Sequence, residues 1–371
     1  MSLKSECEAL LRRFRVPGVG LARVTDSGIE ELCCLGERKQ GTGIAITESD
    51  RWHVGSCTKS MTATLMARLV ERGQLEWDAP VAPMFVAGGV EVHPEFATLT
   101  LRHLLNHRSG MPTDPPAAEV EASFYSSEPL YSLRAAIAAE AMTRGPTHKP
   151  GQAFAYSNLG YVVAGAIAEG VTGTDWEQLV RREVFSPLGL MTAGFGAPGK
   201  QSRGPLARLF GSGTITQPWG HQCGTGIDAL TTTSPDDDLL ADSAPVMGPA
   251  GTVHLSLPDL ARYVAFHVSG GATAPGFLTP HTVDILHTPL PGEDYALGWF
   301  AMAAEASGIG NSIIWHEGSN NAWYAAMLIV PAVGRAWTFV CNGYRESLQD
   351  PQDGLLPALG EIDGNWLNPI I

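Results

Sequence analysis

Hydrophobic positions divide the 371-residue chain into β-like ends and a helical middle. Apolar residues at three- and four-residue spacing predict helices, whereas short runs rich in β-branched and aromatic residues, bounded by Gly, Pro and Asp, predict strands. The predicted strands are 18–24, 29–35, 299–303, 312–316, 322–330 and 336–341, and the predicted helices are 4–15, 56–72, 101–110, 130–144, 160–171, 176–185, 258–268 and 351–361. Strands at both ends imply one antiparallel sheet built from the two termini and flanked by helices, so we expect an α+β fold.

The same pattern predicts a single domain of two lobes. We expect an α/β lobe made of residues 1–55 and 296–371, with an inserted, mainly helical lobe made of residues 56–295. Two stretches rich in Pro, Gly, Ser and acidic residues interrupt the helical lobe. Residues 112–129 are predicted to form a surface loop and residues 194–250 a long irregular segment, and loops of that length are usually functional walls or mobile segments.

The helix expected over residues 56–72 begins with two reactive side chains. Ser56 and Lys59 are three residues apart, so they share one face of its first turn. A serine hydroxyl attacks a carbonyl only when a base removes its proton, and a lysine can do this when its pKa falls from about 10.4 towards 7. Desolvation or a cationic neighbour can supply the roughly 4 kcal/mol that this shift requires. The alternative, which is commoner for an isolated Ser-x-x-Lys, is a helix-capping serine and a surface lysine.

A second stretch, Tyr156-Ser157-Asn158, carries a phenol and an amide two residues apart. In an extended loop both side chains can face the same side. A phenol next to a lysine can relay a proton, and the amide can orient Lys59 or a substrate carbonyl. Taken alone, the stretch is equally consistent with a capped turn before a helix.

A third stretch, Trp-His-Glu-Gly-Ser-Asn, spans residues 315–320 at a strand edge. His316 has a removable proton, and Gly318 lets a substrate lie against bare backbone. The backbone N–H groups of Ser56 and Ser319 can then form an oxyanion hole, in which each donor contributes about 3 kcal/mol. The alternative interpretation of His316 is an ordinary half-buried histidine.

Composition narrows the range of partners and compartments. A formal net charge of −14 disfavours nucleic acid and anionic membrane surfaces, and no apolar run is long enough to span a bilayer. Residues 1–8 contain no hydrophobic secretion segment, which predicts a cytoplasmic protein, or a periplasmic one if a leader has been removed. The six cysteines include no Cys-x-x-Cys pair, so free buried thiols are expected.

Three other motifs are rejected. Residues 194–200 match the start of a phosphate-binding loop, but Gln201 replaces the required Ser or Thr and no strand precedes it. His103 and His107 are four residues apart but lack the glutamate of a zinc hydrolase, so helix packing is the better interpretation. Gly-x-Ser-x-Gly does not occur, which argues against an α/β-hydrolase. We therefore expect chemistry without a metal or a cofactor.

Together the three stretches resemble the serine β-lactamase and penicillin-binding-protein superfamily, specifically its class C β-lactamase-like group. That group contains cephalosporinases, esterases, D-amino-acid peptidases, transesterases and D,D-peptidases. The resemblance covers nearly the whole chain and includes, besides the three motifs, residues 16–18, 101–110, 185–190, 249–251 and 259–262. It implies that Ser56 is the nucleophile, Lys59 its base or proton partner, Tyr156 a second proton carrier and Asn158 a polar positioning group. Either Lys59 or Tyr156 can be the base, since the pair can titrate as a unit.

The third stretch departs from the β-lactamase pattern, which is Lys-Thr/Ser-Gly and holds the carboxylate of the antibiotic. Here His316 and Glu317 precede Gly318. A neutral histidine gives no charge, and Glu317 is expected to repel a carboxylate. His-x-Gly is the form that esterases and some peptidases of this group use.

We therefore expect a serine hydrolase that cleaves a carboxylic ester or a small amide or peptide through an acyl-enzyme on Ser56. His316, Gly318, Ser319 and Asn158 are expected to bind the substrate. The alternatives are a β-lactamase or a D,D- or D-amino-acid peptidase and, from another class, a non-catalytic sensor of penicillin or another ligand.

Overall fold

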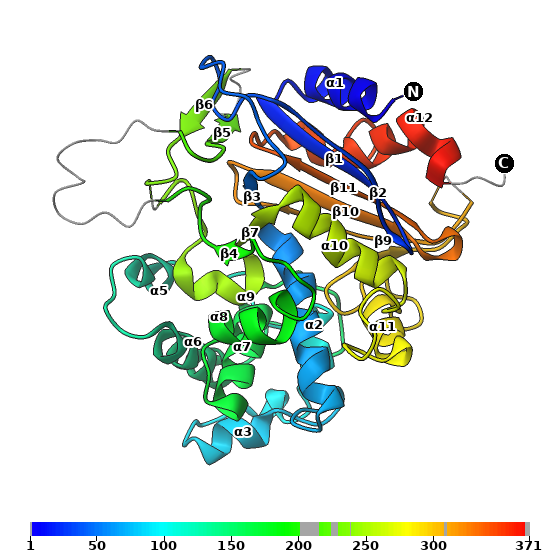
Figure 1. The fold of residues 1–371 in the computed structure, drawn as a ribbon. Coiled ribbons are helices and arrows are strands. Elements are labelled where there is room, and N and C mark those ends of the chain that lie inside the picture. Colours follow the sequence, from blue (N-terminus) through cyan, green and yellow to red (C-terminus); the bar gives the residue numbers. More distant parts are fainter. Residues whose placement is uncertain (1, 201–214, 224–228, 238, 308–309, 368–371) are drawn as a thin grey trace.

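A six-stranded antiparallel sheet, built from both ends of the chain, forms the framework of the fold (Figure 1). The computed structural model describes residues 2–200, 215–223, 229–237, 239–307 and 310–367. The strands lie across the sheet in the order β2 (Gly28–Gly36), β1 (Gly18–Thr25), β11 (Arg335–Cys341), β10 (Tyr324–Val330), β9 (Ile313–Ser319) and β8 (Phe300–Met302). The N-terminal hairpin joins the C-terminal strands along β1 and β11, where Leu21 pairs with Phe339.

Helices cover both faces of this sheet. α1 (Leu3–Phe14) and α12 (Leu355–Leu367) lie on one face, and α10 (Leu257–Val268) lies on the other (Figure 1). Successive residues of a strand point to opposite faces. Phe339 therefore packs in the hydrophobic cluster with α1 and α12, whereas Val340 packs in the larger core with α10.

α2 (Thr58–Glu71) extends from this larger core into the helical part of the chain (Figure 1). Residues 58–67 are all buried, which is typical of a helix surrounded by other elements. The remaining helices with regular α geometry are α3 (Ala82–Ala87), α4 (Leu101–Leu105), α5 (Ala117–Ser123), α6 (Leu130–Arg144), α7 (Asn158–Thr172), α8 (Trp176–Val180), α9 (Gly248–Gly251) and α11 (Pro280–His287). Within the described residues, no helix combines the length and apolar character that crossing a membrane requires.

A small three-stranded sheet positions the start of α2. Its strands are β3 (Arg51–His53), β7 (Val253–Ser256) and β4 (Gly194–Phe195), with β7 in the middle. β3 leads into the turn that carries Ser56, and β7 follows α9. The pairing of β3 with β7 therefore brings the start of α2 close to α9. A separate hairpin consists of β5 (Gly220–Cys223) and β6 (Leu230–Thr233).

The α+β fold with a sheet built from both termini is confirmed, whereas three local predictions are wrong. Residues 112–129 are not all loop, because α5 forms after Pro116, where Ala and Glu supply helix-forming residues. Residues 194–250 contain β4, β5, β6 and part of α9, although residues 201–214 of that segment lie outside the described residues. α11 was not predicted, although Thr279 caps it and Pro280 occupies its first position. The division into two lobes stays a prediction, and α10, which was expected in the helical lobe, packs on the sheet.

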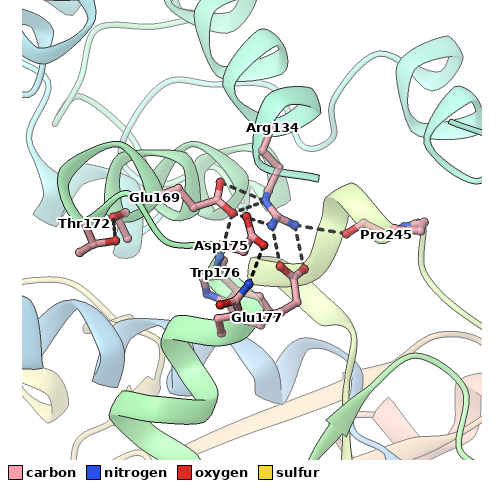
Figure 2. Close-up of polar contacts among 9 residues, drawn as sticks. Arg134, Glu169, Thr172, Asp175, Trp176, Glu177 and Pro245 are labelled. Carbon is pink, nitrogen blue, oxygen red and sulfur yellow. Dashed lines mark hydrogen bonds and ion pairs between the residues drawn. The ribbon is translucent and has the colours of Figure 1, made fainter. Parts of the chain in front are cut away.

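A buried ionic network fixes the turn before α9 (Figure 2). Arg134 of α6 is fully buried, and its guanidinium contacts Glu169 of α7 at 2.6 Å and Glu177 of α8 at 2.7 Å. It also donates to the carbonyl oxygen of Pro245 at 3.4 Å. The network joins three helices to the segment that leads into Gly248. Since buried charges are tolerated only when they are paired, the geometry of this junction is strongly constrained.

Candidate active site

Ser56 lies in a tight turn, Gly55–Cys57, that leads directly into α2. It is partly exposed, whereas its neighbours on both sides are buried. The Nζ atom of Lys59, one turn later, donates to Ser56 Oγ at 2.9 Å and to the carbonyl oxygen of Ala250 in α9 at 2.8 Å. The structure therefore brings the serine and the lysine together as the spacing predicted, and the hydrogen bond to Ala250 O fixes the lysine against α9.

Burial changes the acidity of Lys59. Its side chain is fully buried, and desolvation lowers its pKa to about 7, while the nearby negative charge of Asp114 opposes this shift. The rings of Tyr156 and Tyr161 lie 4.9 and 5.6 Å from Nζ. A lysine with this pKa is neutral in a large fraction of molecules at pH 7, so it can accept a proton.

Tyr156 lies beside the same pair. Burial raises the pKa of its phenol, and a hydrogen bond with Ser56 opposes the rise. The imidazole of His107 packs against the Tyr156 ring with a centroid distance of 4.2 Å, and its Nδ1 accepts from the N–H of Ser157 at 3.0 Å. Tyr156 is therefore a protonated phenol at neutral pH, and its ring is held in place by His107.

Asn158 lies at the first position of α7, which Ser157 caps by accepting from Gly160 N–H. The Asn158 amide donates to Asp114 Oδ1 at 2.7 Å. Asp114 is thus linked to Asn158 and is close enough to Lys59 to raise its pKa. No role was predicted for Asp114, because it lies in the stretch expected to be a surface loop.

His316 and Glu317 lie on opposite faces of β9. The His316 imidazole is buried, with Nε2 3.0 Å from the hydroxyl of Tyr295 and Nδ1 2.7 Å from the carbonyl oxygen of Glu317. Desolvation, together with the charge of Lys59, lowers its pKa to about 3, so it is neutral. The Glu317 carboxylate accepts from Tyr324, which belongs to the cluster with α1 and α12. The expectation that Glu317 faces and repels a substrate carboxylate is therefore wrong, because strand alternation turns it away from His316.

Gly318 and Ser319 pack directly against the turn that carries Ser56. A Cβ atom at Gly318 would lie 2.1 Å from the carbonyl oxygen of Val54 and 2.5 Å from the backbone nitrogen of Ser56. Gly55 has a φ of +49°, and a Cβ atom there would lie 2.4 Å from the backbone nitrogen of Ser319. Only glycine fits at these two positions, and their contact brings the two backbone N–H groups together. The Ser319 hydroxyl donates to Trp323 O at 2.8 Å, so it is used within the hairpin turn.

The sequence predicts no role in the site for several groups that lie near it. Asp114, His107, Tyr295 and the Ala250 carbonyl come from four different segments and meet only through tertiary contacts. His107 had been assigned to packing on a helix, but it lies beyond the end of α4 with a φ of 60°. A positive φ is uncommon for a residue other than glycine, and no pattern in the sequence indicates it.

The rejected zinc motif is explained by other contacts. His103 lies in the capping interaction at the start of α4, where it contacts Thr100, and His107 lies among aromatic rings. Among the residues that the structure describes, no group of three or more His, Cys, Asp or Glu side chains is placed to hold a metal ion.

Comparisons with known proteins agree with this fold. A family model described as Beta-lactamase matches residues 7–359. The chain is 26% identical over 355 residues to penicillin-binding protein 4 of Amycolatopsis lactamdurans, covering 91% of this chain and 83% of that protein. The octameric penicillin-binding protein homologue from Pyrococcus abyssi superposes with a TM-score of 0.73 at 22% identity, covering 98% of this chain and 78% of the other. The D-amino acid amidase from Ochrobactrum anthropi SV3, complexed with L-phenylalanine, superposes with a TM-score of 0.70 at 19% identity, covering 98% and 97%. The chain therefore belongs to the β-lactamase family of serine hydrolases.

Proposed function

We propose that this hydrolase forms an acyl-enzyme on Ser56 and acts on a carboxylic ester or a small amide. The observation that carries the proposal is the contact of 2.9 Å between Ser56 Oγ and the Nζ atom of a fully buried lysine. A hydroxyl becomes a nucleophile when an adjacent base takes its proton, and this contact lies within the range for proton transfer.

The environments of Lys59 and Tyr156 favour different proton-transfer roles for them. Burial lowers the pKa of Lys59 to about 7 and raises that of Tyr156 above its ordinary value. At neutral pH the amine is therefore partly deprotonated, and the phenol is protonated. This supports Lys59 as the base that receives the Ser56 proton and Tyr156 as the group that passes a proton to the leaving group. Water then attacks the acyl-enzyme with the same groups acting in reverse.

The carbonyl oxygen of the substrate becomes an oxyanion during attack by Ser56 and needs hydrogen-bond donors of its own. The backbone N–H groups of Ser56 and Ser319 are candidates, since the contact between Gly55 and Gly318 holds their backbones together. Two such donors would stabilise a tetrahedral intermediate by about 3 kcal/mol each. Gly318 lets β9 lie directly against the turn that carries Ser56, and His316, two residues earlier on the same strand, is neutral and buried.

The charges around Ser56 favour a substrate without a carboxylate next to the scissile bond. A neutral His316 stands where β-lactam-binding relatives are expected to carry a lysine, and Asp114 adds negative charge near Lys59. A carboxylate would therefore gain no charge pairing from His316 and would be repelled by Asp114. A second candidate follows from the same charge: Asp114 favours a substrate with a free ammonium group, such as the amide of an amino acid. The fold shared with a D-amino acid amidase is consistent with this candidate.

The test is to react the protein with p-nitrophenyl acetate and with a fluorophosphonate, measuring both the burst of nitrophenol and the intact mass. We expect a burst near one equivalent and an adduct that maps to Ser56, with both absent in Ser56→Ala. Phenylalanine amide in its D and L forms, compared with the N-acetylated amide, separates the two substrate candidates. Faster cleavage of the free amine than of its acetylated form would favour the amino acid amide. Rapid nitrocefin turnover would instead assign the protein as a β-lactamase.

A further inference from the structure

A segment far from Ser56 in the sequence contacts the residues next to both proposed oxyanion donors, Ser56 and Ser319. Residues 241 and 242 lie between the β5–β6 hairpin and α9. Asp242 contacts His53 at the end of β3, and Ala241 contacts Asn320 just after β9. One short segment therefore links β3, which leads into the turn that carries Ser56, to the end of β9, which carries Ser319.

The first link runs through His53 to the backbone of Gly55. His53 is fully buried, and its Nε2 lies 2.9 Å from Asp242 Oδ1. Its Nδ1 accepts from the backbone N–H of Gly55 at 3.1 Å. Since Nδ1 is an acceptor, the ring proton is on Nε2 and is donated to Asp242. The carboxylate thereby fixes the tautomer that can hold Gly55, the residue that immediately precedes Ser56.

The second link runs through Asn320 to the backbone around Ser319. The Asn320 amide donates to the carbonyl oxygen of Ala241 at 2.9 Å. Its oxygen accepts from the N–H groups of Ala322 and Trp323 at 3.2 and 3.1 Å, which closes the turn between β9 and β10. Ser319 therefore immediately precedes a turn that the Asn320 side chain closes and connects to Ala241.

The His53–Asp242 pair is not a second base for Ser56. A histidine that serves as a general base needs a free nitrogen directed at the hydroxyl. Here one ring nitrogen accepts from Gly55 N–H and the other donates to Asp242, so both are occupied by structural partners. The pair can act on the reaction only through the backbone that it holds.

We propose that Asp242 and Asn320 are positioning residues for the oxyanion hole, and that the segment 241–242 sets the spacing between the N–H groups of Ser56 and Ser319. The inference rests on the proposed function, in which these two groups bind the oxyanion. Such donors act only when they are fixed at the correct distance from the developing charge. Loosening either link therefore weakens stabilisation of the transition state without removing the nucleophile or its base.

The test compares Asp242→Ala and Asn320→Ala on an oxygen ester and on the matching thionoester, whose sulfur is a weak hydrogen-bond acceptor. We expect the kcat/KM for p-nitrophenyl acetate to fall at least about tenfold, because one oxyanion donor is worth about 10² to 10³ in rate. The thionoester should lose much less, so the oxo-to-thiono ratio falls. The ratio is measured on one sample and does not depend on the folded fraction.

For Asp242→Asn, which keeps an acceptor for His53, the kcat/KM should stay within about threefold of wild type. Asp237→Asn removes the same charge from an exposed position four residues before the segment and serves as the matched control.

The two links should also be coupled. If Asp242 and Asn320 both act through the segment 241–242, the kcat/KM of the double alanine variant falls by less than the product of the two single-variant decreases. Amide hydrogen exchange gives a readout that needs no activity, in which Asp242→Ala should speed exchange in peptides covering residues 53–57 relative to Asp237→Asn. An unchanged oxo-to-thiono ratio in both alanine variants, or unchanged exchange, would overturn the positioning role. A wild-type protein without any Ser56 adduct would instead refute the proposed function, while the exchange result would still decide whether Asp242 holds the backbone of residues 53–57.

Discussion

Replacing Lys59 by methionine should make the protein more stable while abolishing acylation. Lys59 is fully buried, and desolvation lowers its pKa from 10.5 to about 7. At 1.36 kcal/mol per pKa unit, a native state that carries this lysine pays about 5 kcal/mol at or below pH 7. Methionine fills a similar volume without that cost.

The net gain is smaller, because Lys59 also makes two hydrogen bonds, to Ser56 Oγ and to Ala250 O. At about 1 kcal/mol each, their loss leaves a stabilisation of about 3 kcal/mol for Lys59→Met at pH 6. Because the folded pKa is depressed, the unfolded chain holds an extra proton between pH 7 and 10.5, so wild-type stability rises with pH over that window. At pH 9 the remaining cost is about 2 kcal/mol, and the difference between variant and wild type should be close to zero.

The assay is urea denaturation of both proteins at pH 6 and pH 9, followed by tryptophan fluorescence. Lys149→Met is the matched control, since its side chain is 72% exposed and its removal should change the stability little at either pH. A Lys59→Met variant that is less stable than wild type at pH 6, or a difference that does not shrink at pH 9, would refute the argument that burial sets the pKa of this lysine.

Three further predictions follow from the site and its supports. The kcat/KM for p-nitrophenyl acetate, measured by stopped flow, should rise with pH through about 7 as Lys59 loses its proton. Asp114→Asn should move this rise to lower pH, because Asp114 raises the pKa of Lys59. A rise that stays at the same pH in the variant would contradict the assignment of Lys59 as the base. Arg134→Met should lower the free energy of unfolding, measured by urea denaturation, by about 3 to 5 kcal/mol, because Glu169 and Glu177 lose their buried partner. An unchanged free energy of unfolding would show that the network does not fix the junction before α9. Gly318→Ala should slow acylation at least about 100-fold, because its Cβ would lie 2.5 Å from Ser56 N. Ser319→Ala keeps the backbone N–H, so its rate of acylation should stay within about tenfold of wild type. Equal burst rates for the two variants would show that the backbone contact at Gly318 does not cause the slower acylation.

The pair at the start of α2 could be predicted because it depends on local geometry. Ser56 and Lys59 are three positions apart, so a helical turn places both on one face, and the apolar pattern of residues 56–72 predicts a helix. The sheet could also be predicted, since the strands at each end show their own β pattern. Tyr156 and Asn158 lie a hundred residues away along the chain, and their place in the site came from the resemblance to a family rather than from any spacing.

The remaining features depend on contacts that the sequence does not display. Asp114, His107 and Asp242 lie in segments that were expected to be loops or packing helices, and they meet Lys59, Tyr156 and His53 only after folding. Glu317 is a different case. The period of two along a strand places Glu317 on the face opposite His316, so the wrong prediction for Glu317 is one that the sequence pattern itself corrects.

In the proposed mechanism Ser56, activated by Lys59, carries the acyl group during turnover. The most direct test is rapid acid quench of the protein during hydrolysis of p-nitrophenyl acetate, followed by intact mass and peptide mapping. We expect an added acetyl group on Ser56 in wild type and its absence in Ser56→Ala and Lys59→Met. Turnover that proceeds with no acetyl group on Ser56, or that persists in Ser56→Ala, would contradict this mechanism.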